Sequence, residues 1–400
     1  MFKNHPKGLL AAALSNMGER FGYYIMNAVL LLFLCSKFGL SDETSGVIYA
    51  VFYALIYVLS LVGGYIADRS QNYKGTIMSG LVTMAVGYAL LSIPILATPE
   101  NTGWLLPFTC GALLLIAFGN GLFKGNLQAI VGQMYDDPKY SDKRDSGFQI
   151  FYVFINVGGL IAPFVAPLLR SWWLKVHDMV YNSNLPALCH AYINNGGNLS
   201  AEQMSNLNEL VGVSSTVPVT DLGVFCTEYL DVFNTGIHYS FFASVAAMLI
   251  SLLIFVFTKK NMPNPAKKEA KVVEQYTKEE KLAMAKEIKQ RMYALFAVLG
   301  IAIFFWFSFH QNGQSLSVFA RDFVTTESIA PEIWQAVNPF FVITLTPIVM
   351  WVFSALRKKR GKDISTPRKI AIGMFIAAIA YLFLTIFSAV MGYPSGEEFR

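Results

Sequence analysis

The chain has 400 residues, of which 54% are hydrophobic and 14% charged, with a formal net charge of +5 and a mean hydropathy of +0.45. An ordinary soluble domain carries about 25% charged residues, so the composition excludes a soluble enzyme and predicts an all-α protein with several membrane spans. The sequence contains no basic patch interleaved with exposed aromatic residues, and nothing in it indicates a nucleic-acid partner.

Nine apolar stretches reach the length of about twenty residues that a helix needs to cross the hydrocarbon core. We expect spans at 8–38, 43–67, 75–97, 104–134, 147–173, 237–258, 292–320, 332–356 and 368–391. Lys and Arg follow spans two and four and separate spans eight and nine, which predicts that these loops and the N-terminus are cytoplasmic. The sequence therefore predicts a multi-pass protein of a cell membrane, the inner membrane in a bacterium.

An adjacent acid and base, Glu19 and Arg20, lie well inside the first span. A charged residue at a helix centre costs roughly 2.5–3.5 kcal/mol even on lenient insertion scales, so such residues normally face a protein interior or a watery path. An ion pair that merely reaches the headgroups is the alternative, which the depth of the two residues disfavours. Polar residues three or four positions apart share one helix face, with Glu19 at its edge: Asn16, Arg20, Tyr23 and Asn27.

Two segments interrupt the spans. Residues 174–236 are rich in Asn, Ser, Thr and Gly, which predicts an outward cap or a loosely folded loop. Cys189 and Cys226 lie in this segment, and an oxidising exterior would permit them to pair if the fold brings them together. Residues 259–291 mix Lys and Glu at helical spacing, which is typical of a solvated cytoplasmic linker helix. The expected parts are an N-terminal bundle at 1–173, the insert at 174–236, a sixth helix at 237–258, the linker at 259–291 and a partial second bundle at 292–400.

The sequence predicts no cofactor and no metal. Its five histidines lack the spacing of a zinc site. The segment 119–124 does not continue into the Gly-Lys-Ser/Thr of a phosphate loop, so we do not expect transport driven by ATP.

Further polar side chains occur inside the other spans. Lys124 in span four follows Gly119 and Gly121, small residues that let neighbouring helices approach closely. As intramembrane cations, Lys124 and Arg20 indicate a functional site, whereas a hydrogen bond between helices would explain the neutral residues equally well. The remaining candidates to line a common cavity are Tyr57, Asn156, Trp306, His310 and Asn338.

Four blocks together resemble the proton-coupled oligopeptide transporters of the major facilitator superfamily. Residues 19–24 are similar to that family's first-helix signature, Glu-x-x-Glu-Arg-Phe-x-Tyr-Tyr. Residues 63–69 resemble the superfamily's loop between helices two and three, and residues 151–159 and 334–339 resemble the family's fifth-helix and eighth-helix blocks. The blocks occur in the family's order along nearly the whole chain.

The resemblance implies two helical bundles, of twelve or more helices in all, that rock around a midplane site and import di- and tripeptides together with protons. It also implies a monomer in the lipid bilayer. The substrate-binding residues that it implies are Arg20, Tyr23, Tyr24, Tyr57, Lys124 and Asn156 in the amino half and Trp306 and Asn338 in the carboxy half.

The expected roles follow from what all peptides share. Arg20 and Lys124 would neutralise the carboxylate of a peptide, and Asn156 and Asn338 would hydrogen-bond its amide backbone. Glu19 is the first candidate for a proton carrier. The second candidate is His310, and the gating residues would be Asp68 and Arg69.

Three departures from the family pattern qualify these expectations. Asn16 replaces the first glutamate of the signature, which removes one titratable group. His310 stands before Gln311 where the family usually has an acid, and an imidazole titrates near pH 6.5. The ninth span is followed by the last residues of the chain, whereas family members have three more helices, including a tenth-helix glutamate.

Two alternatives remain open at this stage. One is an incomplete or truncated transporter fragment without independent transport. A major facilitator carrier of another small solute, such as a drug or a small anion, is the other alternative, which Arg20, Lys124 and the first-helix signature disfavour.

Overall fold

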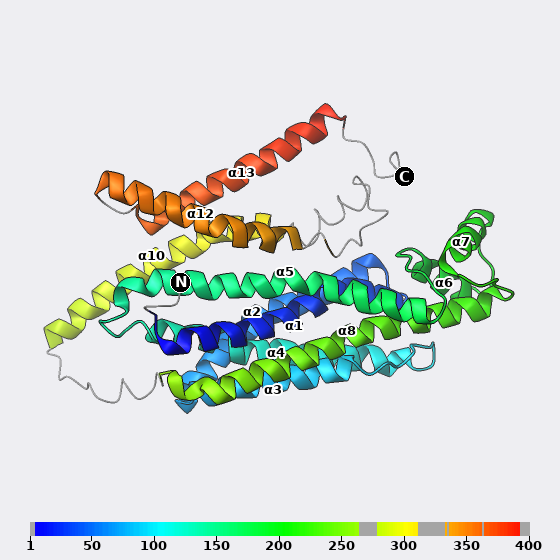
Figure 1. The fold of residues 1–400 in the computed structure, drawn as a ribbon, viewed down its shortest axis with the longest axis horizontal. Coiled ribbons are helices and arrows are strands. Elements are labelled where there is room, and N and C mark those ends of the chain that lie inside the picture. The colour runs from blue at the N-terminus through cyan, green and yellow to red at the C-terminus, as the bar shows by residue number, and fades with distance from the viewer. Residues whose placement is uncertain (1–4, 264–277, 311–332, 334–335, 362–363, 393–400) are drawn as a thin grey trace. The chain divides into compact units, whose positions relative to one another are not determined.

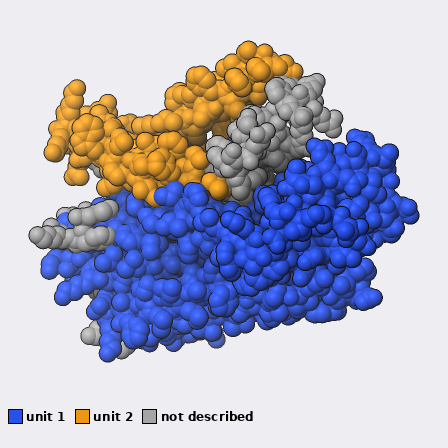
Figure 2. All heavy atoms as spheres, turned by 45° about the vertical axis from the view of Figure 1, so that its right-hand side comes forward, with its two compact units in different colours: residues 1–271 blue, residues 272–400 orange. Residues whose placement is uncertain are grey.

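The computed structural model describes residues 5–263, 278–310, 333, 336–361 and 364–392. The chain divides into two compact units, unit 1 at 1–271 and unit 2 at 272–400 (Figure 2).

Unit 1 consists of long helices and two short ones (Figure 1). The long helices are α1 (Lys7–Phe38), α2 (Asp42–Ser70), α3 (Tyr73–Leu91), α4 (Thr102–Gln133), α5 (Arg144–Val176) and α8 (Leu222–Thr258). The short helices, α6 (Leu185–Asn194) and α7 (Ala201–Ser214), follow α5. Unit 2 contains α10 (Lys278–His310), α12 (Val337–Arg360) and α13 (Thr366–Val390).

Nine of the described helices are long and apolar enough to cross a membrane, in agreement with the nine spans predicted from the sequence. Three bounds differ clearly: α3 ends at Leu91 rather than at 97, α10 begins at Lys278 rather than at 292, and α8 begins at Leu222 rather than at 237. Asp221 explains this start, because its carboxylate accepts hydrogen bonds from the backbone N–H groups of Gly223 and Val224 at 2.8 and 3.1 Å. The 37 residues of α8 make a helix of about 55 Å, so it extends well beyond a hydrocarbon core of about 30 Å.

The core of unit 1 is built around α1, which packs against α5 and α8, while α4 packs against α2 and α3. Glycines permit the closest of these approaches. A Cβ added at Gly63 of α2 would collide with the Gly121 carbonyl of α4, and one at Gly80 of α3 would lie 2.6 Å from the Gly119 oxygen. The predicted role of Gly119 and Gly121 in close helix packing is confirmed.

The segment between α5 and α8 is an ordered cap rather than a loose loop, and it is shorter than the predicted insert because both flanking helices extend into it. We call residues 177–221 the cap; it contains α6 and α7, which lie at one end of unit 1 beside the start of α8 (Figure 1). The backbone N–H of Val180 donates to the Ser214 carbonyl at 2.8 Å, which joins the two ends of the cap. Ser200 forms a capping box with Gln203 at the start of α7.

Unit 2 has little interior among its described residues. Its three candidate spans bury none of their most apolar windows. One described contact between its helices is the hydroxyl of Tyr381 in α13, which donates to the Ser308 carbonyl in α10 at 2.6 Å.

Candidate functional site

The centre of the site is an ion pair between consecutive residues of α1. Arg20 donates from Nε to Oε2 of Glu19 at 2.5 Å and from Nη2 to Oε1 at 2.7 Å. Glu19 is 0% exposed and Arg20 6% exposed. Because bidentate guanidinium–carboxylate bonds are strong and directional, the pair holds the Arg20 guanidinium in one orientation inside unit 1.

A third group completes the surroundings of the Glu19 carboxylate. Asn120 of α4, itself 0% exposed, donates from Nδ2 to Glu19 Oε1 at 2.8 Å. The carboxylate therefore accepts three hydrogen bonds, two from Arg20 and one from Asn120. Together these bonds hold the carboxylate between α1 and α4 in one orientation.

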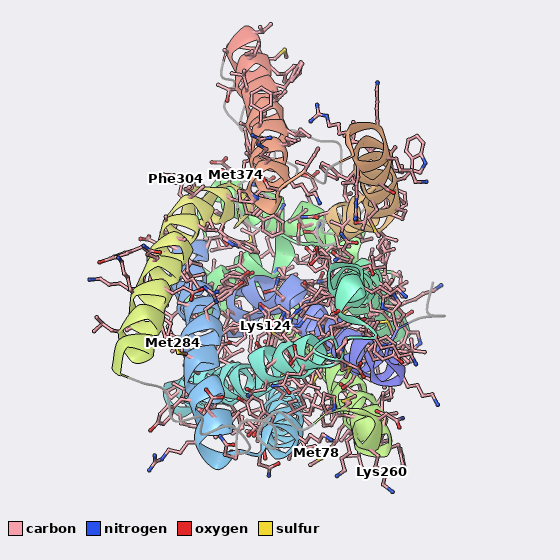
Figure 3. All side chains as sticks on the ribbon, turned by 90° about the vertical axis from the view of Figure 1, so that its left-hand side faces the viewer. Met78, Lys124, Lys260, Met284, Phe304 and Met374 are labelled. Carbon is pink, nitrogen blue, oxygen red and sulfur yellow. The ribbon has the colours of Figure 1, made fainter. Side chains whose placement is uncertain are left out.

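Lys124 is the second cation of the site, and it lies on α4 one helical turn after Asn120 (Figure 3). Its Nζ is 4.9 Å from the centre of the Tyr57 ring of α2, a cation–π contact. Lys124 is half-buried and interacts electrostatically with both Arg20 and Glu19. The close approach of α2 and α4 at Gly121 is what brings the Lys124 side chain to the Tyr57 ring.

Tyrosines extend the polar surface around Arg20. The Arg20 guanidinium carbon lies 4.9 Å from the centre of the Tyr23 ring, and the Tyr23 and Tyr24 rings meet edge to face at 5.5 Å. The hydroxyls of Tyr23 and Tyr49 both donate to Asn27 Oδ1, at 3.4 and 3.0 Å. Three residues of the polar face predicted for the first span, Arg20, Tyr23 and Asn27, are therefore connected in series, while Asn16 of the same face is buried.

Asn156 lies on α5 and is buried, but its amide serves its own helix. Its Nδ2 donates to the Tyr152 carbonyl at 2.9 Å, the spacing of one helical turn. Two residues later, a Cβ at Gly158 would lie 2.8 Å from the Met17 carbonyl, so α5 approaches α1 close to the Glu19–Arg20 pair. The side-chain oxygen Oδ1 of Asn156 takes no part in this bond and can accept a hydrogen bond from another group.

The other predicted site residues are on different segments of the chain. Trp306 on α10 and Asn338 on α12 belong to unit 2. The side chain of His310 and the whole of Trp334 and Gln335, from the eighth-helix block, lie outside the described residues. Asp68 and Arg69 are exposed at the end of α2, where Asp68 accepts a hydrogen bond from the Tyr73 hydroxyl.

The residue that sequence reasoning missed is Asn120. A signal for it existed, because it lies four positions before Lys124 and therefore on the same helical face inside an apolar span. Among the described residues, no group of three His, Cys, Asp or Glu side chains could hold a metal ion.

The chain resembles known transporters along nearly its whole length. A dipeptide and tripeptide permease B of Edwardsiella piscicida is 27% identical over 405 residues, which cover 98% of this chain and 74% of the relative. The permease of the same name from Shigella dysenteriae serotype 1 is 28% identical over 403 residues, which cover 98% of this chain and 74% of that permease.

A solved structure supports the expected fold. The crystal structure of a POT family transporter in complex with a thioalcohol conjugated peptide has a TM-score of 0.61 at 20% identity, and the match covers 98% of this chain and 79% of that one. The model of the POT family matches residues 74–284 and 265–397, which is more than half of the sequence. The chain therefore belongs to the POT family of membrane transporters.

Proposed function

We propose that this protein is a secondary active symporter that imports di- and tripeptides with protons by alternating access. Membership of the POT family and the names of its relatives, which are dipeptide and tripeptide permeases, support the substrate class. The observation that carries the proposal is the excess of positive over negative charge in the group formed by Glu19, Arg20 and Lys124.

The described cluster contains two cations and one anion. Arg20 is neutralised by Glu19. Lys124 interacts electrostatically with both of them, and its Nζ makes a cation–π contact with the Tyr57 ring. Among the described residues, Glu19 is the carboxylate that this cluster contains. A deficit of one negative charge in a partly desolvated site favours a ligand with one carboxylate, and every peptide with a free carboxyl terminus supplies one.

The same charges suggest how proton and peptide are coupled. A peptide carboxylate and the Glu19 carboxylate would compete for the Arg20 guanidinium. Protonation of Glu19 would weaken its hold on Arg20 and free that cation for the peptide, so the two ligands would bind with positive coupling. Glu19 is therefore the proposed proton carrier, with His310 as the second candidate.

Further residues have proposed roles around this centre. Tyr23, Tyr24 and Tyr57 would shape the amino-half pocket through their rings and hydroxyls. Asp68 and Arg69 would bias the gating equilibrium from the exposed end of α2. The other proposed peptide contacts are Asn156, Trp306 and Asn338.

The proposed location is the inner membrane of a bacterium, as a monomer with a cytoplasmic N-terminus. The relatives are bacterial proteins. Lys and Arg lie at the end of α2, in the segment after α4 and at the end of α12, which the proposed orientation makes cytoplasmic; four of them, at 357–360, are in the last turn of α12. The cap then faces outward.

The test is peptide binding to Arg20→Ala and Lys124→Ala in the purified protein, with Lys139→Ala as the control at an exposed loop position. Loss of one charge-assisted contact costs about 1.5–3 kcal/mol, so either site variant should bind a dipeptide about ten- to a hundredfold more weakly. Lys139→Ala should bind like wild type. Wild-type affinity in both site variants would place the pocket elsewhere.

A second measurement tests the charge argument itself. A dipeptide with an amidated carboxyl terminus has the same side chains and no carboxylate. In wild type it should compete poorly with the dipeptide that has a free carboxylate. In Lys124→Ala the affinities of the two peptides should differ less. Equal competition by the two peptides would contradict the proposed role of the cations, while counterflow of a labelled dipeptide in liposomes reports transport separately.

A further inference from the structure

A small apolar core holds the cap against the first turns of α8. Cys189 of α6 and Leu207 of α7 are each 0% exposed, and so is Cys226, the fifth residue of α8. Tyr229, one turn after Cys226, donates its hydroxyl to the Val180 carbonyl of the cap at 3.1 Å. The face of α8 that carries Cys226 is thus the face on which α6 packs.

Cys189 and Cys226 meet at this contact between α6 and α8. Both are free thiols in the structure, buried side by side closely enough to interact electrostatically with each other, and Cys189 also interacts electrostatically with Tyr229. The other two cysteines of the chain have different surroundings, because Cys35 and Cys110 are only half-buried and Cys35 donates to the Ser45 hydroxyl at 3.2 Å. The adjacent pair therefore needs an explanation beyond the packing of small apolar residues.

The position of Cys226 along α8 decides its surroundings. The apolar run that crosses the membrane was predicted at 237–258, and α8 is about 55 Å long, nearly twice the hydrocarbon thickness. The turns before that run stand beside α6 at the end of unit 1 (Figure 1). In the proposed orientation this end lies outside the cytoplasm, where disulfides form and persist.

We propose that Cys189 and Cys226 form a disulfide bond that fastens α6 of the cap to the outward end of α8. The proposal rests on the orientation stated under the proposed function. The bond closes the chain between residues 189 and 226, including α7, and reduces the freedom of that segment in the unfolded protein. It also fixes His190, the neighbour of Cys189, whose Nε2 donates to the Ser36 carbonyl of α1 at 2.7 Å.

The oxidant is the disulfide of a thiol–disulfide oxidoreductase in the envelope. One thiolate attacks that disulfide, and a mixed disulfide forms while one sulfur of the oxidant leaves as a thiol. The second cysteine then attacks the mixed disulfide, which forms the Cys189–Cys226 bond and releases the other sulfur. Two electrons and two protons pass from the cysteines to the oxidant, which becomes a dithiol. Because both cysteines are fully buried in the folded cap, the reaction precedes its closure.

The experiment counts thiols in protein taken from membranes of cells with an oxidising periplasm. A Cys35→Ser/Cys110→Ser background leaves only the pair. The protein is denatured, free thiols are blocked with N-ethylmaleimide, and polyethylene-glycol maleimide is added before or after reduction. We expect no mass shift before reduction and two labels after it, with the protein monomeric on a non-reducing gel. If both cysteines react with N-ethylmaleimide before reduction, so that no polyethylene-glycol label is added after it, the proposal is overturned.

Two controls sharpen this result. Cys189→Ser in the same background must expose Cys226 to the block, so that no label is added after reduction. Reductant should lower the melting temperature of the pair-containing protein by several degrees and leave that of Cys189→Ser/Cys226→Ser unchanged. Equal shifts in the two proteins would also contradict the bond.

A separate label distinguishes failure of the disulfide from failure of the proposed orientation. Ser205 is exposed on α7, so Ser205→Cys in a cysteine-free background reports the side of the cap through a membrane-impermeant maleimide in intact spheroplasts. Labelling from outside together with reduced Cys189 and Cys226 would overturn the disulfide alone. Labelling only after lysis would overturn the orientation, and with it the proposed oxidation.

Discussion

Arg20 donates two hydrogen bonds to the carboxylate of the preceding residue, from Nε to Glu19 Oε2 at 2.5 Å and from Nη2 to Glu19 Oε1 at 2.7 Å. Consecutive residues of a helix do not normally face each other, so the Glu19 and Arg20 side chains turn toward each other to make these bonds. From another helix, Asn120 of α4 donates to Glu19 Oε1 at 2.8 Å. Arg20 thus already holds a carboxylate, which is the group that a peptide would present to it.

Glu19→Gln should separate coupling from exchange. An amide cannot be deprotonated and cannot accept the two guanidinium bonds as a carboxylate does, so Arg20 stays available to a peptide at every pH. We expect loss of uptake driven by a pH gradient, while counterflow of labelled dipeptide continues in the same liposomes. Glu43→Gln, an exposed acid in the first turn of α2, is the matched control and should change neither assay. If Glu19→Gln still accumulates peptide against its gradient, the proton path runs elsewhere.

The contact between Lys124 and Tyr57 predicts a graded series. Tyr57→Phe keeps the ring and should keep most of the affinity for a dipeptide, whereas Tyr57→Leu removes the cation–π contact that positions Lys124. Such contacts contribute about 0.5–2 kcal/mol, so the affinity of Tyr57→Leu should fall by about two- to thirtyfold. Titration calorimetry with a dipeptide measures the affinity of wild type and of the two variants. Equal losses in Phe and Leu would show that the hydroxyl, not the ring, is what matters.

Two neighbouring glycines of α2 provide a packing test. A Cβ at Gly63 would collide with the Gly121 carbonyl, whereas a Cβ at Gly64 meets nothing within 4 Å. Overpacking costs about 1–3 kcal/mol or more, so Gly63→Ala should lower the melting temperature in detergent by several degrees and reduce binding of a dipeptide. Gly64→Ala should leave both unchanged. Similar melting temperatures for the two variants would contradict the α2–α4 contact that places Lys124.

His190 predicts a pH dependence of the cap. Burial lowers the pKa of His190 below its ordinary value of 6.5, and its Nε2 donates to the Ser36 carbonyl. A lowered folded-state pKa means that the histidine contributes stability above about pH 6.5 and that this contribution is lost as the pH falls through the folded-state pKa. The melting temperature should therefore fall by a few degrees between pH 7.5 and 5.

His190→Gln removes the titrating group and should flatten that decline. His177→Gln, which changes the first residue of the cap directly after α5, serves as the control and should keep the slope. Thermal unfolding of the three proteins across the pH range measures the effect. An identical slope in wild type and His190→Gln would assign the pH dependence to other groups.

Much of this protein could be predicted locally. The nine spans follow from uninterrupted apolar length, and Arg20 and Lys124 stand out because an uncompensated charge in a membrane is costly wherever the helix packs. Cap residues were harder to predict. Polar composition suggested a loose loop as readily as a fold, and it did not reveal that Asp221 starts α8 well before the apolar run.

The class of protein and the polar face of α1 could be predicted from local sequence, since hydropathy and helical period depend only on neighbouring residues. Which groups meet depends on how the helices pack. Asn120 reaches Glu19 across 101 positions of sequence, and Cys189 meets Cys226 only because α6 packs on α8. Lys124 reaches Tyr57 because α2 and α4 touch at glycines. The physical reason is that such contacts depend on the distance between helix axes, which is set by packing and not by the pattern along any one helix.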